Sequence, residues 1–527
     1  MAKFVNSSES ISSSLLLWND RPTQVSIEET YDLKVWPVTN LFNDGPINFT
    51  LPPQPKGLLT DLHIVTKLKL QKDGEDFSIP QKNVSIINNL ANSLWGEVSV
   101  ICSDRTELCQ SMKNAYAYQT FFNTALNSEK NREDFLLYNE AFLMDEGVSK
   151  KSEEDLRLFW KWDESHKNAV LDNMVFEESE DNGEGEKEKK KEAYWSASSL
   201  PKALLVEAQR AVLVSSGLSG DNLELALEDF ISNTVNNWIP TDVNPAASKR
   251  SALVNRGQSL TLNSKFQCPL LNTLKCLPTN MKLRLSLTKN KDEFLLLCGD
   301  DSHGYSIVLE DCYILATYYR VRDEIHSLIE ERLQKEPIPY FISRPEIIIR
   351  PVTQSSKIIR MSDVFSDTLP PYAFFTLQRS RDFDGRSNTN PFIFHGFKKF
   401  QFYRNGVPYF NDPLEVGTID KLGDHNYVYS DFGEYFRQLY RTIGKDSKGN
   451  CLIDSTNFHL NFMVGMSFGA DRSSLTERHL NLQEKASTYL EIDLGIEEIP
   501  EDLILIVYAV FDRQLQIDAD RMVRIIE

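Results

Sequence analysis

Residues 60–70 read TDLHIVTKLKL, in which Leu62, Ile64, Leu68 and Leu70 recur at even-numbered positions. Alternate side chains of a β-strand point to the same face of a sheet. The alternation therefore predicts a strand that buries one apolar face and turns the other toward polar surroundings.

Similar signals continue to the C-terminal end of the chain. Residues 503–511, LILIVYAVF, form an unbroken apolar run that is typical of a strand buried on both faces. Asn405-Gly406 follows another apolar stretch and is a strong signal for a tight turn. Further strands are expected at residues 98–102, 260–262, 281–287, 306–315, 317–321, 346–350, 373–377 and 399–403.

Helical signals are few by comparison. Residues 116–126 carry apolar side chains near helical spacing, and residues 322–335 carry an apolar stripe among charged side chains. Helices do not alternate with strands, which excludes a parallel α/β fold. The sequence therefore predicts an all-β protein with two packed sheets in each half and short helices in long loops.

A charged block interrupts the strand pattern of the first half. Residues 177–192 read EESEDNGEGEKEKKKE, and because no residue in them is apolar, we expect a solvated loop. The Ser-rich residues 1–25 are expected to form a flexible N-terminal arm. We predict one β-rich unit with long inserted loops at residues 26–250 and a second at residues 251–527.

The charge balance narrows the range of partners. The 527 residues include 57 Lys and Arg against 76 Asp and Glu, a net charge of −19. A duplex repels such a chain, so we expect no direct tight nucleic-acid binding through the overall field, while a local basic patch stays open. No run of about 18 apolar residues occurs, so no transmembrane segment is expected.

The cysteines and histidines give no metal-site pattern. Seven cysteines are spread thinly with no Cys-x-x-Cys pair, and the eight histidines lack helical zinc spacing. The first residues contain no continuous apolar segment of a secretory signal, so we expect reduced thiols in buried strands. No metal ligand and no cofactor-binding residue is assigned.

Two short motifs could be interpreted as catalytic. Residues 465–469, GMSFG, match the Gly-x-Ser-x-Gly pattern of a nucleophile elbow, and His479 follows closely. An elbow needs a helix after the serine, which the polar residues 470–474 do not predict, so we interpret the motif as the end of a strand. Residues 382–385, DFDG, lack the spacing of a calcium loop and are interpreted as a turn. No catalytic residue is assigned, although a triad of distant residues would leave no such motif.

Aromatic residues gather in the second half of the chain. They bunch at residues 374–375, 392–397, 400–403 and 409–410. We interpret them as the core of packed sheets. A surface platform that stacks on sugar rings or on bases is the alternative interpretation.

Four stretches share an order and spacing with one family. Residues 84–100 contain VSIINNL and SLWGEVSV, followed by NAYAYQ at 114–119. The other stretches are NMKLRLSL at 280–287, then 369–385 with NPFIF at 390–394 and NGVP at 405–408, and finally VYAVFD at 507–512. Together they resemble the hexon-like double jelly-roll major capsid proteins of Polinton/Maverick elements and adintovirus-type viruses, with their endogenous relatives. That family shows NTYPYR where this chain has Ala117 and Gln119 in place of Pro and Arg.

The resemblance implies an architecture and a set of partners. It implies two eight-stranded jelly rolls side by side, and a pseudo-hexagonal homotrimer that tiles an icosahedral shell. It implies neighbouring capsomers, a penton and minor capsid proteins as partners, and no catalysis. It also implies a location in the virion, after synthesis in the host cytoplasm and with assembly there or in the nucleus.

The first functional hypothesis is therefore a structural capsid protein that works by self-association through buried apolar surface. The helix at 322–335 and the long loops around 127–240 are the candidates for trimer contacts or outer towers. The alternative is a carbohydrate-binding or carbohydrate-processing β-sandwich protein, whose processing form needs paired carboxylates in a cleft. A third hypothesis is an endogenous derivative of a capsid gene that serves another role.

Overall fold

The computed structural model describes most of the two predicted β-rich halves. The described residues are 24–41, 45–77, 84–102, 106–109, 112–145, 245–298, 304–352, 358–365, 368–385, 390–416, 419–422, 426–429, 432–445, 450–455, 457–458, 460–469, 480, 484–495 and 503–526. The charged block at 177–192 and nearly all of the predicted arm at 1–25 lie outside them.

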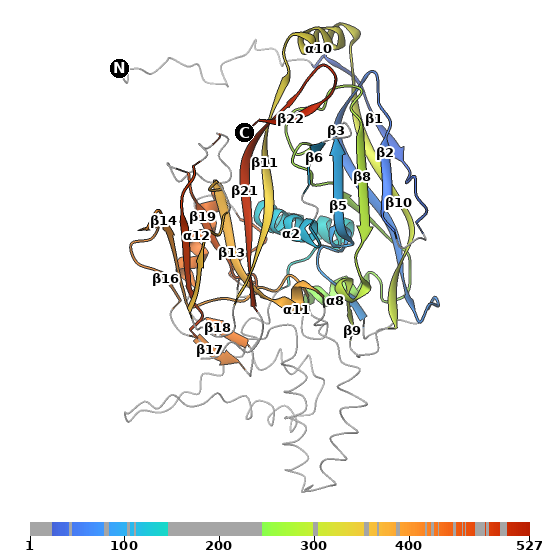
Figure 1. Cartoon of the computed structure of the whole chain (residues 1–527). Helices are drawn as coiled ribbons and strands as arrows, with labels where there is room; N and C mark the ends of the chain where they lie inside the picture. Colours follow the sequence, from blue (N-terminus) through green and yellow to red (C-terminus); the bar gives the residue numbers. More distant parts are fainter. Residues whose placement is uncertain are drawn as a thin grey trace, which may run out of the picture.

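Two antiparallel four-stranded sheets make up the first roll, which is blue to yellow-green in Figure 1. The first sheet has the pairing order β1 (Ile27–Val35), β10 (Tyr305–Val321), β3 (Gly57–Lys72) and β7 (Leu260–Lys265). The second sheet has the pairing order β2 (Ile47–Leu51), β8 (Leu283–Lys289), β5 (Trp95–Cys102) and β6 (Thr106–Glu107). A short pair, β4 (Val84–Ile86) with β9 (Leu296–Cys298), lies beside them.

Two further antiparallel sheets make up the second roll, yellow to red in Figure 1. One has the order β11 (Ile338–Pro351), β21 (Leu503–Ile517), β13 (Tyr372–Arg379) and β19 (Val464–Ser467), with β22 (Val523–Ile526) also on β21. The other has the order β12 (Ile358–Ser362), β20 (Thr488–Asp493), β14 (Lys399–Arg404) and β15 (Val407–Pro408), with β16 (Leu414–Glu415) also on β14. A separate hairpin joins β17 (Ile419–Leu422) to β18 (Asn426–Tyr429).

Both rolls arrange their strands in the same order. In the described part of each roll, we number the strands of the two main sheets in chain order, leaving out β16 and β22. One sheet then reads first, eighth, third, sixth, and the other reads second, seventh, fourth, fifth. This interleaving defines a jelly roll, in which the chain crosses repeatedly between two facing sheets. The predicted all-β fold with two jelly rolls is confirmed.

The predicted boundary near residue 250 is wrong. Three strands that follow it, β7, β8 and β10, pair with strands that precede it, as in Thr66↔Leu262, Phe49↔Leu285 and Ile64↔Ile314. The last three strands of a jelly roll complete sheets that its first strands begin, and a restart of the strand pattern does not reveal such pairing. The rolls meet at helix α10 (Asp323–Lys335), which connects β10 to β11.

The long strands follow their sequence patterns closely. Inward-facing residues of β10 are buried at nearly every second position, and the same holds for much of β3. The two strands that we predicted at 306–315 and 317–321 are one strand, with register shifts at Leu309/Asp311 and at Thr317/Tyr318. The predicted turn is also confirmed, because Asn405 and Gly406 have φ angles of 50° and 77° and join β14 to β15.

The described helices occupy connections between strands. They are α1 (Leu90–Ser93), α2 (Ala115–Asn127), the 3-10 helix η2 (Lys130–Arg132), α3 (Glu133–Glu140), α8 (Pro245–Ala252), α9 (Asp292–Leu295), α10, α11 (Ser380–Phe383) and α12 (Gly433–Ile443). Both rolls carry a long helical excursion in the connection before their sixth strand, with α2 in the first roll and α12 in the second. Figure 1 shows α2 in the middle of the molecule, between β5 and the paired strands β11 and β21.

Candidate functional site

The serine of the elbow-like motif is part of a strand. Ser467 is the last residue of β19, is 5% exposed, and pairs with Tyr372 of β13. Its carbonyl oxygen accepts a hydrogen bond of 2.7 Å from the hydroxyl of Tyr409. The next two residues form no helix, and His479 lies outside the described residues. The strand–serine–helix geometry that an elbow requires is therefore not built by the described residues here.

Residues 382–385 span the end of a helix and a turn that packs against the first roll. Asp382 and Phe383 are the last two residues of helix α11, so the predicted turn is limited to Asp384 and Gly385. The amide of Gly385 donates to the carbonyl oxygen of Asp382 at 3.1 Å. Gly385 has a φ of +73°, and a Cβ there would lie 2.6 Å from the Cα of Phe294. The position therefore requires glycine both for its backbone conformation and for its close approach to the neighbouring roll.

Most of the bunched aromatic side chains of the second roll are core, while Tyr403, Tyr409 and Phe410 are half-buried. Phe374, Phe375 and Phe392 are at most 2% exposed, and the same is true of Phe394, Phe397, Phe400 and Phe402. The rings contact one another, as in Phe397–Phe400, whose centroids are 5.7 Å apart. Buried rings cannot stack on a sugar or a base, so the prediction of a sheet core is confirmed for these seven residues.

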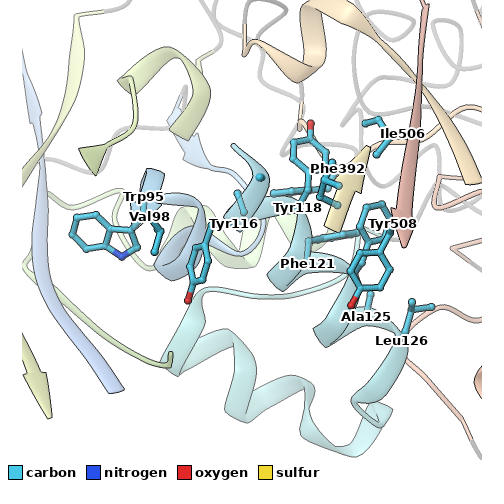
Figure 2. Close-up of a cluster of buried hydrophobic side chains, with 14 of the residues drawn as sticks. Trp95, Val98, Tyr116, Tyr118, Phe121, Ala125, Leu126, Phe392, Ile506 and Tyr508 are labelled. Atoms are coloured by element: carbon cyan, nitrogen blue, oxygen red, sulfur yellow. The ribbon is translucent and has the colours of Figure 1, made fainter. Parts of the chain in front are cut away.

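Helix α2 carries a second aromatic cluster that joins the rolls, and we call it the seam. Phe121 stacks on Phe392 of the second roll with a centroid distance of 4.4 Å and an interplanar angle of 4°. Phe122 stacks on Tyr508 of β21 at 5.2 Å. Figure 2 shows Phe121, Phe392 and Tyr508 between α2 and the second roll. Aromatic pairs add specific geometry to apolar burial, so the seam fixes how the rolls sit against each other.

Polar contacts extend the seam. The hydroxyl of Tyr118 lies 2.9 Å from Oε1 of Gln378 and 3.0 Å from the carbonyl oxygen of Pro391. Burial raises the pKa of Tyr118 well above its usual value, so the phenol stays a neutral donor. The side-chain amide of Gln119 donates to the carbonyl oxygen of Pro345 on β11 at 3.1 Å. Buried donors and acceptors are thereby paired across the two rolls.

A buried ion pair lies next to the seam. Nη2 of Arg250 on α8 is 2.7 Å from Oδ1 of Asp145, and the two side chains are 0% and 4% exposed. Arg250 also donates to the carbonyl oxygen of Leu143 at 2.7 Å, and the amide of Asn390 in the second roll donates to Oδ2 of Asp145. The pair therefore holds together the segment that ends at Asp145 and helix α8. The hydrogen bond from Asn390 anchors both to the second roll.

A second contact between distant segments lies at the end of the molecule that carries α10 (Figure 1). Nη2 of Arg521 is 2.7 Å from both carboxylate oxygens of Glu330 on α10, and its Nε donates to the carbonyl oxygen of Thr279 at 2.8 Å. Burial opposes ionisation of Glu330, but the hydrogen bonds from Arg521 and Thr279 hold its pKa below the usual value. The C-terminal hairpin is thus fixed to the helix that links the rolls.

Glu140, the last residue of α3, is the described carboxylate with the clearest raised pKa. Burial raises its pKa to about 7, while a 3.2 Å hydrogen bond from Nδ2 of Asn92 opposes the shift. Folding therefore favours the protonated carboxyl. The contribution of Glu140 to stability is fully present below the unfolded-state pKa near 4.5 and is lost as the pH rises through about 7.

We predict that Glu140→Gln removes this pH dependence. The free energy of unfolding of the unchanged chain should fall between pH 4.5 and 8 by about 2–3 kcal/mol more than that of the variant. Urea unfolding across this pH range measures the difference. Glu97→Gln, on the exposed side of β5, is the control and should follow the unchanged chain. Parallel profiles for the chain and Glu140→Gln would contradict the prediction.

Neither a metal site nor a membrane-spanning helix is found in the described part of the chain. The described residues contain no group of three or more His, Cys, Asp and Glu side chains that could hold a metal ion. Within the same part of the chain, no helix has the length and apolar character needed to cross a bilayer. The sequence missed the seam and the Arg250–Asp145 pair, because contacts between residues far apart in the chain leave no local pattern.

Comparisons with known proteins agree with this architecture. No protein-family model and no curated protein matches the chain. A chain in the structure of the Sputnik virophage matches with a TM-score of 0.50 at 11% identity, covering 100% of this chain and 94% of that one. The mavirus major capsid protein matches with a TM-score of 0.50 at 9% identity, covering 100% and 96%. The chain therefore shares, over its whole length, the double jelly-roll fold of these virophage proteins.

Proposed function

We propose that the chain is a structural subunit of a viral capsid. One observation carries the proposal: the two-roll fold matches the mavirus major capsid protein over 100% of this chain and 96% of that protein. The match therefore spans both rolls, which a chance likeness between single sandwiches would not produce. The function is structural and needs no catalytic residue.

The seam supports this function mechanically. A shell subunit must present several contact surfaces at fixed angles, because the lattice closes only if every copy has the same shape. Two rolls joined only by a linker would move relative to each other, since interfaces between domains commonly allow motion. Here the aromatic stack, the Asn390–Asp145 hydrogen bond and the hydrogen bond from Arg521 to Thr279 join the rolls at separate points. The subunit is thereby suited to act as a rigid tile.

Several apolar side chains are exposed on the monomer and are suited to form contacts between subunits. Apolar side chains that meet water in the monomer gain free energy when a partner covers them. We propose that they serve contacts within a homotrimer and between neighbouring capsomers, with Leu328 on helix α10 among them. The more exposed examples are Trp36 at 55%, Val38 at 73%, Leu274 at 92%, Leu328 at 64% and Val407 at 64%.

The remaining partners follow from the same proposal. A shell of such tiles needs a penton and minor capsid proteins, and it would be found in the virion after synthesis in the host cell. The net charge of −19 argues against tight direct binding of the genome. The carbohydrate alternative is not favoured, because seven of the bunched aromatic side chains that could have formed a sugar platform are buried.

The native mass tests the proposed assembly. We expect light scattering on the purified chain to give about three times 60.5 kDa, near 180 kDa, and electron microscopy to give hexagonal outlines. Leu328→Asp should shift the population toward monomer, since it places a charge on a surface proposed to be covered. Thr30→Asp, on the exposed side of β1, is the control. A chain that stays monomeric at high concentration would contradict the proposed homotrimer.

A further inference from the structure

The turn between β21 and β22 carries an arginine in an unusual backbone conformation. Arg521 has a φ of +64°, in the left-handed region that residues with a side chain seldom adopt. The carboxylate of Asp518 holds the turn, because its Oδ1 accepts hydrogen bonds from the amides of Asp520 at 3.1 Å and Met522 at 2.9 Å. A backbone conformation that costs free energy persists only where its surroundings enforce it, and such residues often have a specific role.

The side chain of Arg521 reaches two segments outside its own hairpin. Its Nη2 lies 2.7 Å from both carboxylate oxygens of Glu330 on α10, and its Nε donates at 2.8 Å to the carbonyl oxygen of Thr279, which precedes β8 of the first roll. The hydroxyl of Thr279 donates to the same carboxylate at 2.9 Å. Arg521 is 13% exposed and Thr279 is 1% exposed. We call these three residues the clasp.

Helix α10 has little apolar burial of its own to hold it in place. Of its thirteen residues, all of which the structure describes, only Leu333 is buried, while Ile325 and Ile329 are half-buried. Asp323 at its start pairs with Lys56 of the first roll, but both side chains are mostly exposed, and water screens such a pair. The clasp therefore supplies a sheltered and directional contact that the apolar side of α10 does not provide.

The C-terminal hairpin also contacts an edge of the first roll. The hydroxyl of Thr106 on β6, the edge strand of its sheet, donates to the carbonyl oxygen of Val523 on β22 at 2.8 Å. Figure 1 shows β22 at the end of the molecule that carries α10. The hairpin thus bonds to the first roll at Thr106 and Thr279 and to the linking helix at Glu330.

We propose that the C-terminal hairpin is a strap across the junction of the rolls, and that Arg521 is a positioning residue that holds α10 in the orientation required for subunit contacts. The left-handed turn directs the guanidinium into the junction, where its planar set of donors can hold two partners at once. Without the clasp, α10 keeps one buried residue and an exposed ion pair, so the position of Leu328 is poorly fixed. The step from the clasp to assembly rests on the homotrimer proposed above, in which another copy covers Leu328.

Hydrogen exchange on the full chain tests the strap. Arg521→Gly is the variant of choice, because glycine adopts a φ of +64° readily and the change removes only side-chain contacts. It is compared in a chain that also carries Leu328→Asp, so that loss of subunit contacts does not itself expose α10. The amides of α10 should exchange at least about tenfold faster, while those of β3 and β10 keep their rates.

Arg524→Ala is the matched control for this experiment. It removes the same charge from the same hairpin, but Arg524 is 75% exposed and its partner Asp518 lies within the hairpin. The exchange of α10 should therefore not change in the control. Equal α10 exchange with and without Arg521→Gly would overturn the proposal. Faster exchange of β3 and β10 as well would also overturn it, because the effect would then not be local to the junction.

Light scattering tests the link between the clasp and assembly. At a concentration where the chain with native Leu328 and its Arg524→Ala variant have the mass of a trimer, Arg521→Gly should be mainly monomeric. Arg521→Lys should be intermediate, because lysine keeps the charge but lacks the planar set of donors. Faster α10 exchange with an intact trimer would overturn the control of assembly. A monomeric unchanged chain would contradict the proposed homotrimer, and the exchange measurement would still decide the strap.

Discussion

Replacing Asp145 by alanine should lower the free energy of unfolding by about 3–5 kcal/mol. The loss arises because Arg250, which is 0% exposed, keeps its charge inside the protein with no carboxylate beside it. The remaining contacts of Arg250 to the carbonyl oxygens of Leu143 and Ile86 solvate the guanidinium but do not neutralise it. The segment that ends at position 145 would also lose its hydrogen bond from Asn390 in the second roll.

Urea unfolding of Asp145→Ala measures this effect. Asp323→Ala is the matched control, because Lys56 and Asp323 also form an ion pair of 2.7 Å but are 60% and 78% exposed. The control should leave stability nearly unchanged, since water and salt screen such a pair. The double variant Asp145→Leu/Arg250→Met should recover most of the loss, because it removes both charges. A double variant as unstable as Asp145→Ala would show that the unpaired charge is not the cause.

The second large effect is expected at the centre of the seam. Phe121→Ala should cost about 3–5 kcal/mol, because it removes a fully buried ring and leaves a cavity. The lost ring contacts include Phe392 at 4.4 Å, Phe142 at 5.6 Å and Phe394 at 5.9 Å. Since Phe392 and Phe394 belong to the second roll, the change should also weaken the coupling between the rolls.

Calorimetry distinguishes loss of stability from loss of coupling. Phe121→Ala should broaden or split the thermal transition, because the two rolls no longer unfold as one unit. Phe49→Ala is the matched control: Phe49 lies on β2 within the first roll and is 1% exposed, as Phe121 is. The control should lower the midpoint without splitting the transition. Identical transition shapes for the two variants would contradict a coupling role of the seam.

Strand positions could be predicted where one strand carries its own pattern. The alternation at residues 60–70 indicated β3, and the apolar run at 503–511 indicated β21, whose residues 504–511 are all buried. Their ends were less accurate, because β21 continues to Ile517, where the run of apolar residues has ended. Pairing partners sustain a strand beyond its local signal, as β11 does for β21 down to Ile338↔Ile517.

The domain boundary could not be obtained in this way. Apolar periodicity indicates that a segment forms a strand with a buried face, but it does not indicate which strand pairs with it. The sequence therefore placed β7, β8 and β10 in the second unit, although they complete the sheets of the first. Helix α10 was predicted correctly, and only the strand pairing around it reveals its role as the connection between rolls.

The candidate contacts between rolls were hidden for a related reason. The spacing of Phe121 and Phe122 indicated the helix α2, but nothing nearby indicated that Phe392 and Tyr508 would meet them. Asp145, the partner of Arg250, is 105 residues away from it in the chain, and Asn390, which donates to Asp145, is 245 residues away from Asp145. In a single sequence the two members of such a pair are far apart, and nothing near either residue indicates its partner. The contact becomes visible only in the folded structure.

The ion pair between Asp145 and Arg250 also makes the chain suitable for the insertion of a foreign protein domain. Asp145 is the last described residue before positions 146–244, and Arg250 follows that stretch by six positions. A guest domain inserted there would enter and leave the subunit beside one fixed anchor, and insertions succeed where the two attachment points lie close together. Every contact that we describe between the rolls would remain in the carrier. Such a carrier could present many copies of an epitope at regular spacing.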